Sequence, residues 1–181
     1  KHMLLKKGGQ EDWKKLQGQI YGPHMRKAKV FEGFSNFLKK FLCEKNEIYI
    51  ISHKTKFGNY DINKTLLREV AIEWLKENKI INYNKKGILE KNVFFLSSQK
   101  EKVDKIESLN LDFFIDDLRE ILLAIKNSNI KKIFFQGNSV STVDNIKSLN
   151  DWNEISRYIH GYKKILTLIE NVETITNDKV I

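Results

Sequence analysis

The segment IYIISHKT, residues 48–55, passes from four apolar residues directly into four polar ones. A short apolar run rich in β-branched residues is typical of a strand that is buried on both faces, as strands of parallel sheets are. The abrupt change at Ser52 marks the end of that run. We therefore expect residues 48–51 to form a central strand.

Further apolar runs alternate with helical patterns along the chain. Alternation of this kind is typical of βαβ units. We predict an α/β fold, a three-layer Rossmann-like sandwich with a mainly parallel sheet flanked by helices, plus a small helical cap. The other predicted strands are 93–96, 111–115 and 133–135, and the helices between strands are 61–78, 99–109 and 118–125.

Helical spacing of apolar residues also predicts helices at both ends of the chain. Residues 10–21 and 34–42 have this spacing, and Asp61 is a suitable N-cap for the helix that follows the first strand. From residue 149 onward, apolar residues on either side of Gly161 predict two tail helices.

Composition limits the class of protein. A chain of 181 residues with 41% hydrophobic content is sufficient for one core of ordinary size. No stretch approaches the roughly 18 apolar residues of a membrane helix, and no signal peptide is recognisable. We expect a cytoplasmic protein with no membrane partner. The single cysteine, Cys43, cannot form an internal disulfide, and its place in a helical pattern predicts burial.

The formal charge of +9 favours partners that carry phosphate. The chain has only four arginines, however, and base readout in nucleic acids favours the guanidinium fork over lysine. The lysines are dispersed in pairs such as 39–40 and 163–164. This pattern indicates a solvated surface and argues against nucleic-acid binding.

Polar residues follow each predicted strand. In open α/β sheets, functional groups gather beyond the carboxyl ends of the strands. These positions are therefore the first candidates for a site. They are Ser52, the turn at 97–99, Asp116 with Asp117, and residues 136–138.

Asp116 and Asp117 are the candidate metal ligands. Two carboxylates at the end of a buried strand make a hard, oxygen-rich site that suits Mg²⁺ bound also to a substrate phosphate. The alternative is structural, because Asp is favoured at the start of a helix and a helix is predicted here. The residues themselves leave both interpretations open.

Ser52 and Lys102 are the candidate phosphate-binding residues. A serine at a strand end can donate to a phosphate oxygen, and a lysine near the start of the helix 99–109 can balance phosphate charge. Any strand can end in serine, and Lys100 and Lys105 are competitors for the second role. Three polar neighbours of Ser52 are candidate substrate-binding residues: His53, Lys54 and Thr55.

The order of these features resembles motifs two to four of the haloacid dehalogenase (HAD) superfamily. Along the chain these features are, in order, a strand that ends in Ser, a Lys near the start of a later helix, and a strand that ends in Asp-Asp. The resemblance covers roughly residues 8–136 and includes local similarity to a bacterial phosphatase-like subgroup. The similar segments are 9–22, 50–55, 93–95 and 114–118.

The resemblance implies a Mg²⁺-dependent phosphatase. Ser52 would bind the transferring phosphoryl group, Lys102 would hold phosphate and nucleophile together, and Asp116 with Asp117 would bind Mg²⁺. Residues 1–30 would form the helical cap, 31–148 an α/β core that lacks its first strand, and 149–181 C-terminal helices.

The nucleophile is the departure from the family pattern. The family uses an Asp-x-Asp at the end of its first strand to form an aspartyl-phosphate, and no such motif follows an apolar run before Ile48. We expect a segment before Lys1 to supply it. The alternatives are a noncatalytic module that binds phosphate or a partner and, against the charge pattern, a nucleic-acid-binding protein. A cap of short helices favours a small phosphorylated metabolite as substrate.

Overall fold

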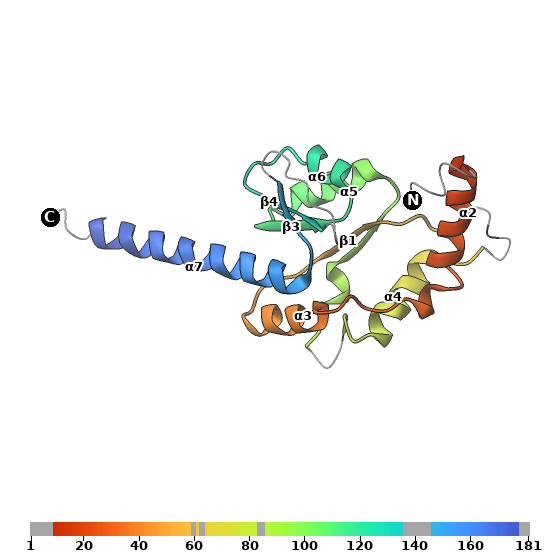
Figure 1. Cartoon of the computed structure of the whole chain (residues 1–181), viewed down its shortest axis with the longest axis horizontal. Helices are drawn as coiled ribbons and strands as arrows, with labels where there is room; N and C mark the ends of the chain where they lie inside the picture. The colour runs from red at the N-terminus through yellow and green to blue at the C-terminus, as the bar shows by residue number, and fades with distance from the viewer. Residues whose placement is uncertain (1–8, 59–60, 62–63, 83–85, 136–145, 178–181) are drawn as a thin grey trace. The chain divides into compact units, whose positions relative to one another are not determined.

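Helices alternate with strands along the chain, and all pairings of the named strands are parallel. The computed structural model describes residues 9–58, 61, 64–82, 86–135 and 146–177 (Figure 1). The predicted α/β class, with parallel sheets flanked by helices in the Rossmann-like manner, is confirmed. The chain divides into two compact units, Lys1–Leu109 and Asn110–Ile181.

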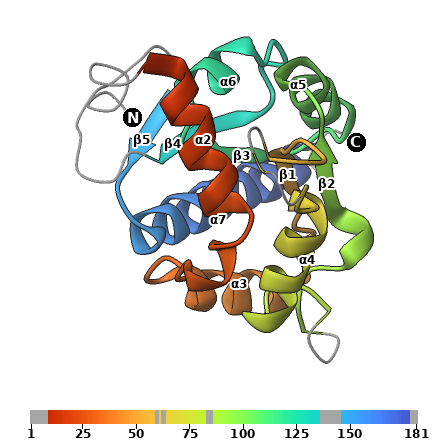
Figure 2. The same ribbon diagram turned by 90° about the vertical axis from the view of Figure 1, so that its right-hand side faces the viewer.

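The first unit contains a two-stranded parallel sheet, β1 beside β2, in which Ser52 is paired with Phe95 (Figure 2). Helix α5 contacts both strands, and α2 contacts α4. The elements in chain order are α2 (Gly9–Tyr21), the 3-10 turn η1 (Met25–Lys27), α3 (Phe34–Cys43), β1 (Ile50–His53), α4 (Leu67–Glu77), the 3-10 turn η2 (Glu90–Asn92), β2 (Val93–Leu96) and α5 (Gln99–Ser108).

The core of the first unit lies among α3, α4 and the sheet. Leu38 of α3 and Leu75 of α4 are buried there together with three isoleucines. Apolar residues of β1 and β2, among them Ile50 and Phe95, pack against this cluster. Burial of this aliphatic surface is the main favourable term in folding the unit. The isoleucines are Ile80, Ile81 and Ile88.

Three details of the first unit correct the sequence prediction. Strand β1 ends at His53, two residues later than expected, so Ser52 lies inside the strand. Helix α4 begins at Leu67, because the Asp61 carboxylate accepts a hydrogen bond from the Thr65 N–H (2.7 Å) in the preceding turn and does not cap the helix. Cys43 is the last residue of α3 and is exposed.

The second unit contains a three-stranded parallel sheet in the order β3-β4-β5. Helix α6 contacts β3 and β4. The first turns of α7 place aromatic rings against the strands: Tyr158 meets Phe113 edge to face, and Trp152 lies against Phe135. The elements are β3 (Phe113–Asp116), α6 (Arg119–Ala124), β4 (Lys131–Phe135), β5 (Ile146–Leu149) and α7 (Trp152–Asn177).

The C-terminal part of the chain differs from the sequence prediction in two ways. Strand β5 was not expected, because Lys147 and Ser148 interrupt its apolar pattern. Helix α7 continues through Gly161, where two helices were predicted. One glycine costs a helix roughly 1 kcal/mol relative to alanine, which neighbouring turns can offset.

Residues 136–138, a candidate strand end, lie outside the described residues. None of the described helices is both long and apolar enough to cross a bilayer.

The same substitution at two glycines should have opposite effects. A Cβ at Gly161 would meet no atom within 4 Å, so Gly161→Ala should raise the free energy of unfolding by about 0.5–1 kcal/mol through better helix propensity. A Cβ at Gly22 would lie 2.7 Å from the Gly18 carbonyl oxygen, so Gly22→Ala should lower stability by about 1–3 kcal/mol. Urea denaturation followed by circular dichroism measures both changes. A stabilised Gly22→Ala variant would contradict the close backbone contact.

Candidate functional site

Ser52 and Lys54 share one face of the β1–β2 sheet at its carboxyl end. The ladder continues past β1, because the Lys54 N–H donates to the Leu96 carbonyl at 2.9 Å. Side chains two positions apart in an extended chain point to the same side. A hydroxyl and an ammonium group therefore follow one another on this face.

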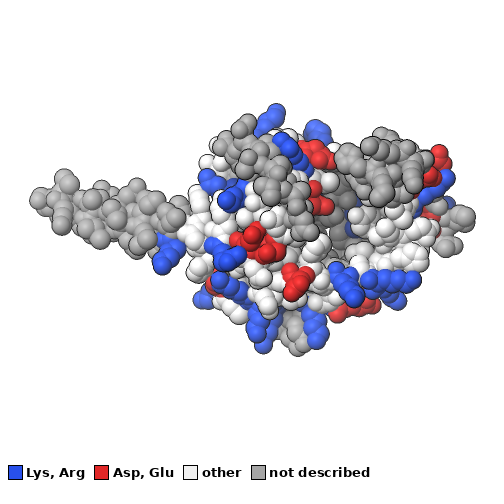
Figure 3. All heavy atoms as spheres, viewed as in Figure 1, with Lys and Arg blue, Asp and Glu red and all other residues white. Residues whose placement is uncertain are grey.

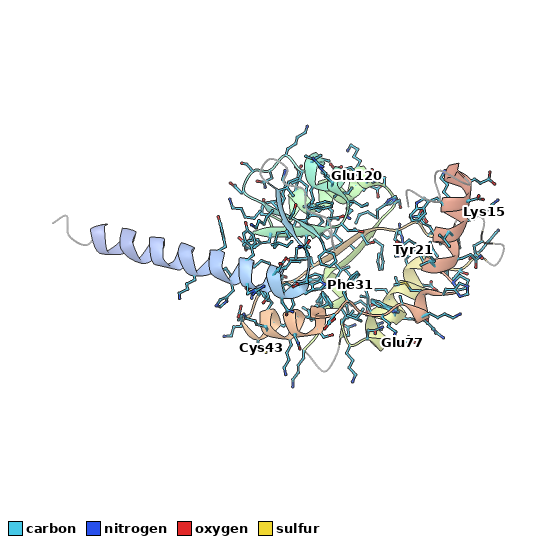
Figure 4. All side chains as sticks on the ribbon, in the orientation of Figure 1. Lys15, Tyr21, Phe31, Cys43, Glu77 and Glu120 are labelled. Atoms are coloured by element: carbon cyan, nitrogen blue, oxygen red, sulfur yellow. The ribbon has the colours of Figure 1, made fainter. Side chains whose placement is uncertain are left out.

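The Lys54 ammonium lies against the aromatic ring of Tyr21, 4.5 Å from its centroid. Tyr21 is the last residue of α2 and is labelled in Figure 4. Burial lowers the pKa of Lys54 below its usual range. Within the described part of the chain, no carboxylate lies within ion-pair distance of this ammonium. Lys54 is thus a partly desolvated cation beside a π face.

His53 and Thr55 have local hydrogen-bond partners. The Nε2 atom of His53 lies 3.1 Å from the Ser97 carbonyl oxygen. The Thr55 hydroxyl donates to the Phe57 carbonyl at 2.8 Å. These contacts connect and shape the loops that follow β1 and β2. The prediction that both residues bind substrate stays a prediction.

Arg68 is a site residue that the sequence analysis missed. From the first turn of α4, its Nε donates to the Lys54 carbonyl at 3.0 Å and its Nη2 donates to the Ser97 hydroxyl at 2.8 Å. One guanidinium therefore connects the loops that follow both strands. The signal in the sequence is weak, namely one arginine among four in a chain rich in lysine.

Lys102 is buried in the first turns of α5, with only 6% of its surface exposed. Its two competitors are occupied elsewhere: the Nζ of Lys100 pairs with Asp104 at 2.8 Å, and the Nζ of Lys105 lies 3.9 Å from the centroid of the Phe94 ring. Of these three lysines, Lys102 is the buried one, and this distinguishes it as the candidate for the phosphate-binding role.

The start of α5 is held by a capping arrangement. The Ser98 hydroxyl accepts from the Glu101 N–H at 3.1 Å, and the Glu101 carboxylate accepts from the Ser97 N–H at 3.0 Å. This reciprocal pattern satisfies backbone donors that the first turn leaves open. It fixes the turn that precedes Lys102 at the end of β2.

Asp116 is the last residue of β3 and is 8% exposed, whereas Asp117 is exposed. The Oδ1 atom of Asp116 accepts from the Leu118 N–H at 2.8 Å. Leu118 is the N-cap residue of α6, and no side chain caps that helix. Neither aspartate is therefore the N-cap residue itself, and the choice between a structural and a metal-binding role stays open. Asp116 instead holds the turn between strand and helix.

The donor set at Asp116 and Asp117 suits Mg²⁺ as part of a larger set of ligands. Both offer hard carboxylate oxygens, and Mg²⁺ is commonly held by one or two carboxylates together with substrate phosphate and water. Among the described residues, no group of three His, Cys, Asp or Glu side chains forms a candidate metal cluster. The remaining ligands would have to come from substrate, water or other groups.

The predicted site residues fall into two sets. Ser52, Lys54 and Lys102 belong to the first unit, where the carboxyl ends of β1 and β2 and the start of α5 bring them to one end of a sheet. Asp116 and Asp117 belong to the second unit. No family model, curated protein or solved structure matches the chain. The proposed function therefore rests on the chemistry of these two sets of residues.

The cap of α5 can be tested by Ser98→Ala. Loss of the N-cap acceptor should lower the free energy of unfolding by about 1 kcal/mol. Ser108→Ala is the matched control, because that hydroxyl donates to the Lys105 carbonyl in the last turn of the same helix and caps no helix start. It should change stability by no more than a few tenths of a kcal/mol. Equal urea midpoints for the two variants would contradict the capping role of Ser98.

Proposed function

We propose that this chain is the larger part of a cytoplasmic, Mg²⁺-dependent phosphohydrolase of the HAD type that acts on a small phosphorylated metabolite. The observation that carries the proposal is the buried Lys102 near the start of α5, at the same end of a parallel sheet as Ser52. Lys102 places a positive charge at the end of the sheet where ligands bind in α/β folds, and a phosphate is a suitable anion for it.

In this proposal the first unit binds the phosphoryl group. The Ser52 hydroxyl donates to one phosphate oxygen, and the Lys102 ammonium balances its charge. Electrostatic attraction is stronger at a buried position than in water, because the effective dielectric constant is lower. Lys102 would also stabilise the negative charge that gathers on the phosphoryl oxygens in the transition state.

The second unit contributes Asp116 and Asp117 as Mg²⁺ ligands. When bound, the ion supplies positive charge to the phosphate oxygens and helps to orient the phosphate. The bond from the Leu118 N–H to the Asp116 carboxylate favours the ionised form that a metal ligand requires, whereas burial opposes it.

The nucleophile is proposed to be an aspartate on a segment before Lys1. Its carboxylate would attack phosphorus in line, the bond from phosphorus to the leaving oxygen would break, and a second aspartate would protonate that oxygen. Water would then cleave the aspartyl-phosphate. Support comes from the strand edges: among the named strands, β1 pairs only with β2, and β3 pairs only with β4. Each has a second edge at which another strand can pair.

A noncatalytic phosphate-binding module is the second candidate. It is favoured by the absence of an Asp-x-Asp nucleophile motif before Ile48. Nucleic-acid binding has less support: on the face shown in Figure 3, Asp and Glu side chains lie among the Lys and Arg side chains. Such mixing weakens the field that a phosphate backbone would meet.

Phosphate release by the product of the intact gene tests the proposal. We expect hydrolysis of one or more compounds in a panel of sugar and small-molecule phosphates, dependent on Mg²⁺. Asp116→Asn should abolish the metal dependence and nearly all activity. Lys102→Met should lower kcat/KM by about 10²–10³, the loss typical of removing one group that stabilises transition-state charge. Lys100→Met is the matched control and should retain activity, because Lys100 pairs with Asp104 on the surface.

Three results separate the candidates. Equal loss in the two lysine variants would contradict the assignment of Lys102. Activity that survives both Asp116→Asn and chelation of Mg²⁺ would contradict the metal site. Phosphate binding without turnover by the verified intact protein would favour the noncatalytic module.

A further inference from the structure

We propose that Lys54 binds a second anionic group of the substrate, beside the phosphoryl group held at Ser52. The inference rests on the proposed function and names its substrate class: small metabolites that carry a phosphate and a further anion, either a carboxylate or another phosphate. Both anions have oxygen acceptors that an ammonium can bind.

The spacing along the chain supports a second subsite. Ser52 and Lys54 lie on one face of the extended segment, and two residues of a strand span about 7 Å. The flexible lysine stem allows its ammonium to reach toward or away from the serine. A compound whose two anionic groups are a few bonds apart can therefore contact both residues.

The charge around Lys54 also supports an anionic ligand. The Tyr21 ring lies against the Lys54 ammonium, and the Arg68 guanidinium is bound to the Lys54 carbonyl. Within the described residues, neither Lys54 nor Arg68 forms an ion pair. Burial lowers the pKa of Lys54, so the charged form is disfavoured until an anion offsets the lost hydration. A charge that costs stability and lies at a strand end suits ligand binding.

The surrounding backbone holds this lysine in place. Arg68 fixes the Lys54 carbonyl to the loop after β2 through Ser97. On the other side, a Cβ at Gly58 would lie 3.1 Å from the Gly18 Cα, so the loop after β1 and helix α2 are in direct backbone contact. The contact keeps Tyr21, three residues after Gly18, beside the ammonium. Lys54 is thus supported from α2, α4 and the loop after β2.

Isothermal titration calorimetry with two probes tests the inference on the full chain. Methyl phosphate carries one anionic group, and phosphoglycolate carries a phosphate and a carboxylate. We expect phosphoglycolate to bind about tenfold more tightly, the gain expected from one additional charge-assisted contact. Lys54→Gln should reduce this preference to about one.

Lys56→Gln is the matched control. Lys56 is an exposed lysine of the same loop, with its Nζ 5.2 Å from the centroid of the Phe57 ring, and its replacement should leave the preference unchanged. The melting temperature of Lys54→Gln should equal or exceed that of the wild type, because a desolvated charge is removed. A lysine with a merely structural role would lower the melting temperature and leave the preference intact.

The outcomes distinguish this inference from the proposed function. Methyl phosphate binding that is lost in Lys102→Met, with no preference for phosphoglycolate, would overturn the Lys54 subsite alone. A preference that persists in Lys54→Gln would overturn it as well. Failure of both probes to bind, or binding indifferent to Lys102→Met, would overturn the phosphate site and the inference that depends on it.

Discussion

Parallel pairing of β1 with β2 is the constraint on which the candidate site depends. In a parallel pair both carboxyl ends lie at the same edge, so the residues after β1 meet those after β2. This register allows His53 to contact the Ser97 carbonyl and Arg68 to connect the Lys54 carbonyl with the Ser97 hydroxyl. Antiparallel pairing would place the end of β2 beside the start of β1, and none of these contacts would form.

Basic side chains gather at this edge of the sheet. Lys54 is partly desolvated, Lys102 is buried near the N-terminus of a helix, and Arg68 lies between two loops. Burial removes part of the hydration of Lys54, and under the proposed function a bound anion would offset that cost. Burial of the apolar cluster around Leu38 and Leu75 stabilises another part of the same unit.

In both units, carboxylates in turns accept hydrogen bonds from backbone N–H groups. Asp61 accepts from the Thr65 N–H, Glu101 from the Ser97 N–H and Asp116 from the Leu118 N–H. These bonds satisfy donors that turns leave open. A carboxylate has about four acceptor positions, so Asp116 can hold its turn and still be a metal ligand. Structural and functional roles are therefore compatible at Asp116.

The sequence by itself determined the α/β class and most elements, because long apolar runs and helical spacing report burial directly. The pattern at 93–96 became β2, and that at 34–42 became α3. Periodicity failed to predict element boundaries that depend on local polar contacts or single residues. Asp61 holds a turn and does not begin a helix, and α7 continues through Gly161. Strand β5 was missed because Lys147 and Ser148 interrupt its apolar pattern. Only the tertiary structure showed that Arg68 connects two loops, that Lys102 and not Lys100 is buried, and that Tyr21 meets Lys54. Those contacts join residues far apart in the chain, and their burial depends on packing, which no local pattern of residues encodes.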